Sequence, residues 1–135
     1  MRRKAIIIEK SNDGKRCIAV DKENAETIIN YLEQDKRHLN KFIDICNLIF
    51  HGLSNRALYD KEEPDKKSKG VRAMKFFKGQ ENDRIYCKEM SLDDKTFVVI
   101  TAELLLKKKT KKLSHREKSL IQKVASYDYE IEEPR

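Results

Sequence analysis

The chain has 135 residues, of which 39% are charged and 39% hydrophobic, and its formal net charge is +7. This length fits one ordinary domain with a modest core, so we expect residues 1–135 to form a single domain. No apolar run approaches the roughly 18 residues that a bilayer-spanning helix needs, so we expect a cytoplasmic protein with no membrane partner. The basic charge balance favours a polyanionic partner, either a nucleic acid or an acidic protein.

The cysteines and histidines argue against a metal site or a disulfide framework. Cys17, Cys46 and Cys87 are odd in number, lie far apart and form no CxxC pair. We therefore expect three reduced thiols in a reducing compartment. Histidine and cysteine never cluster at the spacing of metal ligands, and no glycine-rich phosphate loop is present. The sequence thus predicts no metal and no cofactor.

The first segment predicts a β-hairpin. Residues 5–8 ("AIII") and 17–20 ("CIAV") are β-forming stretches. Between them Asp13 and Gly14 form a strong two-residue turn signal.

A helical region follows the hairpin. Apolar residues recur at intervals of three and four between residues 25 and 50, which is typical of an amphipathic helix. Asp21 or Asn24 is the expected cap, and Gly52 is the expected stop. The polar residues 33–37 interrupt the apolar stripe, so one long helix and a helical hairpin both remain open.

Three strands are predicted after a polar loop. The loop at about 60–70 contains a proline and a glycine, and we expect it to be mobile. Residues 71–78 and 83–90 alternate as half-buried strands do, whereas 95–106 is a nearly continuous apolar run that indicates a central strand. The hairpin-length connections predict an antiparallel three-strand meander.

The chain ends with a predicted helix and an acidic tail. Ser114 followed by Glu117 is a capping box, so we expect a C-terminal helix to begin there. The tail at 128–135 leaves three alternatives open: a frayed end, an extra strand, or a brake folded over the lysines. The predicted fold class is α+β, an antiparallel sheet with an N-terminal hairpin, a long helix or helical hairpin, the meander and the C-terminal helix.

Basic side chains gather on the predicted meander and on the run that follows it. Arg84, Tyr86 and Lys88 share one face of an alternating strand, and Lys75 on the neighbouring strand can join them. Arginine can clamp a phosphate with two hydrogen bonds, lysine supplies a point charge and tyrosine can stack on a base. A solvated charged face is the competing interpretation of the lysine cluster, and a packing role is that of Tyr86. The other candidate RNA-binding residues are Arg72, Lys107, Lys108, Lys109, Lys111, Lys112 and Arg116.

The order of elements resembles the RelE/ParE/HigB superfamily of bacterial toxins. The closest likeness lies in "VVITAELLLKKKTKKLSHREKSLIQKV", where an apolar strand leads through a Lys-Lys-Thr-x-Lys run into a charged helix. "GVRAMKFF" and "DRIYCKEM" are similar to the two preceding strands of that superfamily. The likeness covers roughly residues 70–125. Leu106 stands where the family commonly has an aromatic residue, and Ser114 where it often has a proline.

The resemblance implies a toxin of a type II toxin–antitoxin system, with a RelE-like fold and a cognate antitoxin protein as partner. Many relatives cut messenger RNA on the ribosome without a metal. In that chemistry a site must remove a proton, stabilise extra negative charge and protonate the leaving oxygen. We expect Arg84 and Lys75 to stabilise the phosphate, and His115, Tyr127 or Tyr129 to transfer protons. Two alternatives remain open: a ParE-like inhibitor of DNA gyrase, and a non-catalytic basic binding module on the same fold.

Overall fold

The computed structural model describes residues 2–77, 82–106 and 114–134. These residues form a mixed α+β fold with a mostly antiparallel sheet, which confirms the α+β part of the predicted class. The elements are β1 (Arg2–Lys10), β2 (Arg16–Asp21), α1 (Ala25–Glu33), α2 (Lys36–Phe50), β3 (Tyr59–Lys61), the 3₁₀ helix η1 (Lys66–Ser68), β4 (Val71–Lys75), β5 (Arg84–Ser91), β6 (Phe97–Leu105), α3 (His115–Ser126) and β7 (Asp128–Glu132).

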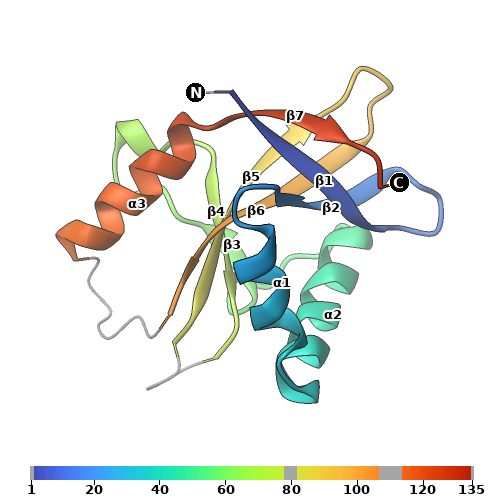
Figure 1. The fold of residues 1–135 in the computed structure, drawn as a ribbon, viewed down its shortest axis with the longest axis horizontal. Helices are drawn as coiled ribbons and strands as arrows, with labels where there is room; N and C mark the ends of the chain where they lie inside the picture. Colours follow the sequence, from blue (N-terminus) through green and yellow to red (C-terminus); the bar gives the residue numbers. More distant parts are fainter. Residues whose placement is uncertain (1, 78–81, 107–113, 135) are drawn as a thin grey trace.

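All the described strands belong to one open sheet with the order β3-β4-β5-β6-β2-β1-β7 (Figure 1). Neighbouring strands are antiparallel except for the pairs β2–β6 and β1–β7, which are parallel. The predicted N-terminal hairpin is confirmed, because β1 pairs with β2. Gly14 in its turn has a φ of 71°, a conformation that a residue without a Cβ adopts at no steric cost.

Helices cover both faces of the sheet. On one face, Ile28 of α1 and Ile45 of α2 pack in a cluster with Val99 of β6. On the other face, Ile121 and Val124 of α3 pack in a second cluster that includes Ala73, Tyr86 and Ile100. Because β6 lies between the two clusters, its residues 98–102 are at most 1% exposed, as the continuous apolar run predicted.

The helical region is divided between α1 and α2, which decides between the two alternatives that the sequence left open. α2 begins after Asp35, whose side chain accepts a hydrogen bond from the backbone N–H of His38. This N-cap satisfies one of the free donors at the start of a helix, and so fixes a new helix start inside the polar stretch.

The C-terminal part of the chain forms the predicted helix and an additional strand. α3 begins with the predicted capping box, in which Ser114 and Glu117 exchange hydrogen bonds between side chain and backbone. The tail forms β7, which runs parallel to β1 from the pair Arg2–Asp128 onward. Of the three alternatives for the tail, the structure therefore shows the extra strand. The segment predicted as a loop at about 60–70 contains the end of β3 and the turn η1.

Within the described ranges, no helix is long and apolar enough to cross a membrane. The three cysteines are buried and unpaired with one another.

Candidate functional site

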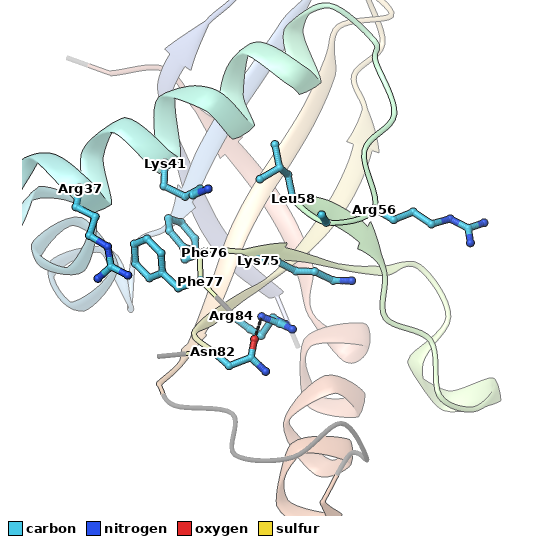
Figure 2. A pocket seen from close by; sticks show the side chains of 10 residues that line it. Arg37, Lys41, Arg56, Leu58, Lys75, Phe76, Phe77, Asn82 and Arg84 are labelled. Carbon is cyan, nitrogen blue, oxygen red and sulfur yellow. Dashed lines mark hydrogen bonds between the residues drawn. The ribbon is translucent and has the colours of Figure 1, made fainter. Parts of the chain in front are cut away.

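A pocket of about 510 Å³ opens between α2, the segment before β3 and the ends of β4 and β5 (Figure 2). Its volume lies within the range of about 300–1,000 Å³ that is common for small-ligand sites. Five of the described lining residues are cationic, and none of the described lining residues is acidic. They are Arg37, Lys41, Arg56, Lys75 and Arg84, together with Ala57, Leu58, Phe76, Phe77 and Asn82.

Two of the five cations lie directly opposite each other on the neighbouring strands β4 and β5. Lys75 is the last residue of β4, Arg84 is the first residue of β5, and the two are direct partners in the antiparallel register. Like charges placed directly opposite each other destabilise a strand pair, because their side chains lie close together on the same face. A bound anion would convert this repulsion into two favourable contacts. The pair therefore has the electrostatic character of an anion-binding site.

Arg84 is only weakly neutralised by its surroundings. Its Nη1 donates hydrogen bonds to Asn82 Oδ1 at 2.5 Å and to the backbone oxygen of Asp83 at 3.3 Å, both neutral acceptors. Over the described ranges Arg84 forms no ion pair. Burial lowers the pKa of its guanidinium, while Tyr86 and the carboxylates of Glu62, Glu117 and Asp83 act in the opposite direction. Arginine nevertheless stays charged, so a half-desolvated cation is held at the pocket wall.

The other cations come from segments far from β4 and β5 in sequence. Arg37 and Lys41 lie one turn apart on α2, so both side chains emerge on the same side of the helix. Among the described residues, Lys75 forms an ion pair with Asp60 of β3, at 3.8 Å between Nζ and Oδ2. Figure 2 shows the Arg56 side chain extending away from the other labelled side chains.

The pocket can therefore bind an extended anion with several phosphate groups more readily than one small anion, because its positive charges are spread over three parts of the fold. Protein-family models, curated proteins and solved structures give no match to this chain. Its functional interpretation therefore depends on the chemistry of the pocket and on the likeness of its sequence motifs.

Two of the five cations of this site were predicted from the sequence, and three were not. Arg84 and Lys75 were expected to act together on a phosphate, and the structure does bring them together. Arg37, Lys41 and Arg56 were missed, because on an amphipathic helix and in a polar loop such residues read as ordinary solvated charges. The alternation of polar and apolar residues on α2 carries no signal that a strand end lies nearby.

Tyr86 is a correction. The sequence suggested that its ring could stack on a base, but the residue is 0% exposed and belongs to the core cluster under α3. Arg84, Tyr86 and Lys88 do alternate on one face, but α3 covers that face. Tyr86 therefore has the packing role that was the competing interpretation.

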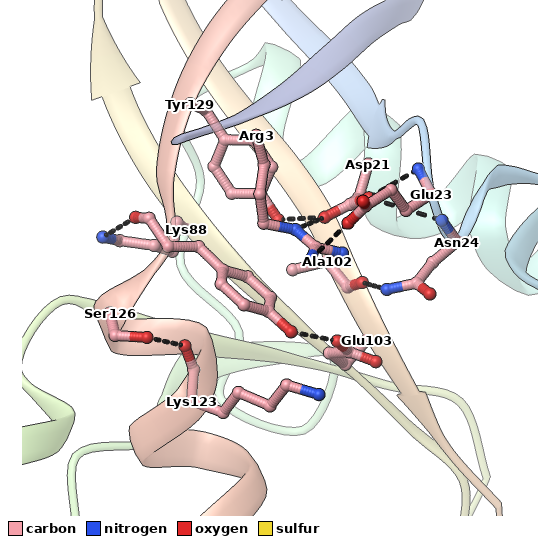
Figure 3. A network of polar contacts seen from close by, with 11 residues as sticks. Arg3, Asp21, Glu23, Asn24, Lys88, Ala102, Glu103, Lys123, Ser126 and Tyr129 are labelled. Carbon is pink, nitrogen blue, oxygen red and sulfur yellow. Dashed lines mark hydrogen bonds and ion pairs between the residues drawn. The ribbon is translucent and has the colours of Figure 1, made fainter. Parts of the chain in front are cut away.

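Lys88 and Arg72 have structural partners. The ammonium group of Lys88 donates to the backbone oxygens of Ala125 and Tyr127 at 3.0 and 2.7 Å, at the C-terminal end of α3 (Figure 3). A cation at this end of a helix satisfies free carbonyl groups and stabilises the helix dipole. Arg72 pairs with Glu63 at 2.8 Å and with Glu89 at 3.5 Å. Neither residue lines the pocket.

The two tail tyrosines are buried and take part in a polar network, of which Figure 3 labels Tyr129. The hydroxyl of Tyr129 donates to Asp21 Oδ2 at 2.6 Å, and that of Tyr127 donates to Glu103. Burial and these carboxylate acceptors raise the pKa of both hydroxyls above the ordinary tyrosine value. Each hydroxyl already donates its proton to a carboxylate, and neither tyrosine is among the described lining residues of the pocket.

We predict an alkaline titration in which four tyrosines resist ionisation. Burial raises the pKa values of Tyr59, Tyr86, Tyr127 and Tyr129 in the folded state. The unfolded chain ionises near pH 10, so it releases protons first and stability is lost as the pH rises above about 10. Tyrosinate absorbance should therefore rise together with the loss of circular dichroism. Ionisation of all four near pH 10, with native dichroism retained, would contradict this burial.

The remaining predicted residues are dispersed or lie outside the described residues. His115 and Arg116 are exposed in the first turn of α3 and do not line the pocket. The predicted RNA-binding residues Lys107, Lys108, Lys109, Lys111 and Lys112 fall outside the described ranges. Among the residues that the structure describes, no three side chains of His, Cys, Asp or Glu gather as metal ligands.

Proposed function

We propose that this protein binds RNA through the cationic pocket and acts as the toxin of a type II toxin–antitoxin system, cutting messenger RNA on the ribosome. The observation that carries the proposal is the cross-strand pair of Lys75 and Arg84 in a pocket whose described lining has five cations and no carboxylate. Phosphate contacts from lysine and arginine dominate the affinity of nucleic-acid binding. The likeness of the sequence to the RelE/ParE/HigB superfamily supplies the remaining part of the proposal.

The proposed reaction is an attack of the 2′-hydroxyl on the neighbouring phosphate. The 2′-oxygen loses its proton and bonds to phosphorus, the bond from phosphorus to the 5′-oxygen breaks, and that oxygen takes up a proton. The products are a 2′,3′-cyclic phosphate and a 5′-hydroxyl. Arg84 and Lys75 would stabilise the extra negative charge on the phosphate oxygens, and Lys41 would hold a flanking phosphate.

Proton transfer is the part of the reaction that the described pocket supports least. Its described lining contains no His, Tyr, Asp or Glu. This observation favours a second candidate function, a basic binding module that holds RNA without cutting it. Of the three proton-transfer candidates, His115 has an exposed side chain but does not line the pocket, and Tyr127 and Tyr129 are buried.

A cognate antitoxin is part of the proposal. A domain with a net charge of +7 suits an acidic segment that covers the pocket and folds on binding. Such a complex should weaken as salt screens its charges.

Inducible expression in a bacterial host tests the proposed function. We expect the wild-type chain to stop growth and primer extension to reveal cuts in translated messages. Arg84→Ala and the double variant Lys108→Ala/Lys109→Ala should restore growth, whereas Arg2→Ala should not. Arg2 is a suitable control because it loses the same charge at an exposed position, where it pairs with Asp128 at 3.4 Å.

The same assay distinguishes the alternatives. Growth arrest without cleavage would contradict the endoribonuclease and favour gyrase inhibition. A supercoiling assay with purified protein would then test gyrase inhibition. Unimpaired growth with folded protein present would favour the binding module and contradict the toxin.

A further inference from the structure

An aromatic cluster forms one wall of the cationic pocket. Phe77 follows β4, and the guanidinium carbon of Arg37 lies 3.7 Å from the centroid of its ring. Figure 2 shows these two side chains lying together at one side of the pocket, with Lys75 and Arg84 beyond them. The stack of a planar cation on an aromatic ring is thus placed beside two phosphate-binding candidates.

The ring under Arg37 is held in place by its neighbours. Phe77 makes edge contacts with His38, at 5.0 Å between ring centroids, and with Phe76, at 6.4 Å. Phe76 is 1% exposed and packs against Tyr31 in turn. The ring of His38 is itself fixed, because its Nδ1 lies 2.7 Å from the carboxylate of Asp35. A wall supported in this way costs little conformational entropy when a ligand packs against it.

The Arg37 guanidinium is more accessible to a ligand than the Phe77 ring. Phe77 is partly covered, whereas Arg37 is exposed on the first turn of α2. The guanidinium is planar and delocalised, so one of its faces can lie on the ring while the other receives a second flat group. Unpaired bases stack on arginine planes as well as on aromatic side chains, and single-stranded nucleic acids are recognised in this way.

We propose that a single unpaired base of RNA stacks on the Arg37 guanidinium, which Phe77 supports from behind, while the adjacent phosphate binds Lys75 and Arg84. This assigns the pocket to single-stranded RNA rather than to a duplex, because a paired base cannot lie flat on that wall. The inference rests on the proposed RNA-binding function of the pocket and adds a base-recognition wall to it.

The test compares binding of two short deoxyoligonucleotides of equal length, one intact and one with its central bases removed. Both lack the 2′-hydroxyl, so the proposed reaction cannot consume them, and both carry the same phosphate charge. We expect the wild-type protein to bind the intact strand at least about fivefold more tightly than the abasic strand, since one stacked base contributes that much. A duplex of the same sequence should bind no better than the abasic strand.

Two variants assign the difference to the wall. Arg37→Lys keeps the charge but loses the plane, and Phe77→Leu keeps apolar volume but loses the ring. Each should bind the intact and abasic strands about equally, because the stack that distinguishes the two strands is lost. Phe77→Trp should retain the preference, which separates loss of the stack from a folding defect, and thermal unfolding of each variant checks the fold.

The outcomes separate this inference from the function on which it rests. If wild type binds both strands equally and Lys75→Ala weakens both, the pocket binds phosphate and the stacking wall is wrong. If Phe77→Leu, folded as wild type, keeps the full preference for the intact strand, the wall is also wrong. If neither strand binds at low salt, the proposed function itself fails and takes the inference with it.

Discussion

Arg84→Ala is expected to abolish growth arrest while leaving the protein folded. In the proposed reaction Arg84 acts where negative charge develops, and removing one such group from an enzyme typically lowers kcat by about a hundred- to a thousandfold. The cost in stability should be small, within about 1 kcal/mol, because Arg84 forms no ion pair over the described residues and donates there to the neutral oxygens of the Asn82 side chain and the Asp83 backbone.

Single-turnover cleavage of a translated message, together with urea unfolding, measures both quantities on the same preparation. Arg84→Lys keeps the charge but loses the two-pronged geometry, so its rate should lie between those of wild type and Arg84→Ala. Arg2→Ala is the matched control and should cleave at the wild-type rate. Equal rates for Arg84→Ala and wild type would remove Arg84 from the reaction.

Asp21→Ala is expected to destabilise the fold strongly, by several kcal/mol. Asp21 is 0% exposed at the end of β2. Its side chain accepts hydrogen bonds from Arg3 Nε at 2.7 Å, from the Tyr129 hydroxyl at 2.6 Å and from the backbone N–H of Glu23 at 2.8 Å. One carboxylate thus links β1, β7 and the turn before α1 (Figure 3).

Removal of Asp21 leaves the Arg3 guanidinium, whose side chain is 9% exposed, with only the exposed Glu23 as an ion-pair partner among the described residues. Breaking a buried pair in this way costs about 3–5 kcal/mol of folding free energy. Asp128→Ala is the matched control, since its pair with Arg2 is exposed and contributes about 0–1 kcal/mol. Urea unfolding midpoints measure both. A loss for Asp21→Ala no larger than for Asp128→Ala would contradict the role of the network.

Short sequence motifs correctly predicted turns and helix starts, because these features depend on residues close together in the chain. The Asp13-Gly14 turn closes the first hairpin, and the Ser114–Glu117 capping box begins α3. The continuous apolar run at β6 was diagnostic because only a strand covered on both faces buries consecutive residues, as at 98–102. The division of α1 from α2 was left open, because the cap formed by Asp35 has no proline or glycine to announce it.

The candidate site was predicted only in part, because the sequence does not show which helix covers which part of the sheet. Alternation along β5 shows that Arg84, Tyr86 and Lys88 share a face, but it does not show how far α3 extends over that face. α3 buries Tyr86 and engages Lys88, whereas Arg84 at the start of the strand lies at the pocket. The cations that Arg84 joins come from α2 and the segment before β3, and only the tertiary fold brings them together.

The most direct test of the account is to map the binding of a short 2′-O-methyl RNA strand by amide chemical-shift perturbation on the full chain. This strand keeps the bases and phosphates but cannot be cut, because its 2′-oxygen is blocked. We predict that the largest shifts lie at Lys75, Phe77 and Arg84 and at the start of α2 around Arg37, and that they shrink as salt is raised. Shifts confined to the outer faces of α3 and β7, with the pocket residues unchanged, would contradict the central claim that this pocket binds RNA.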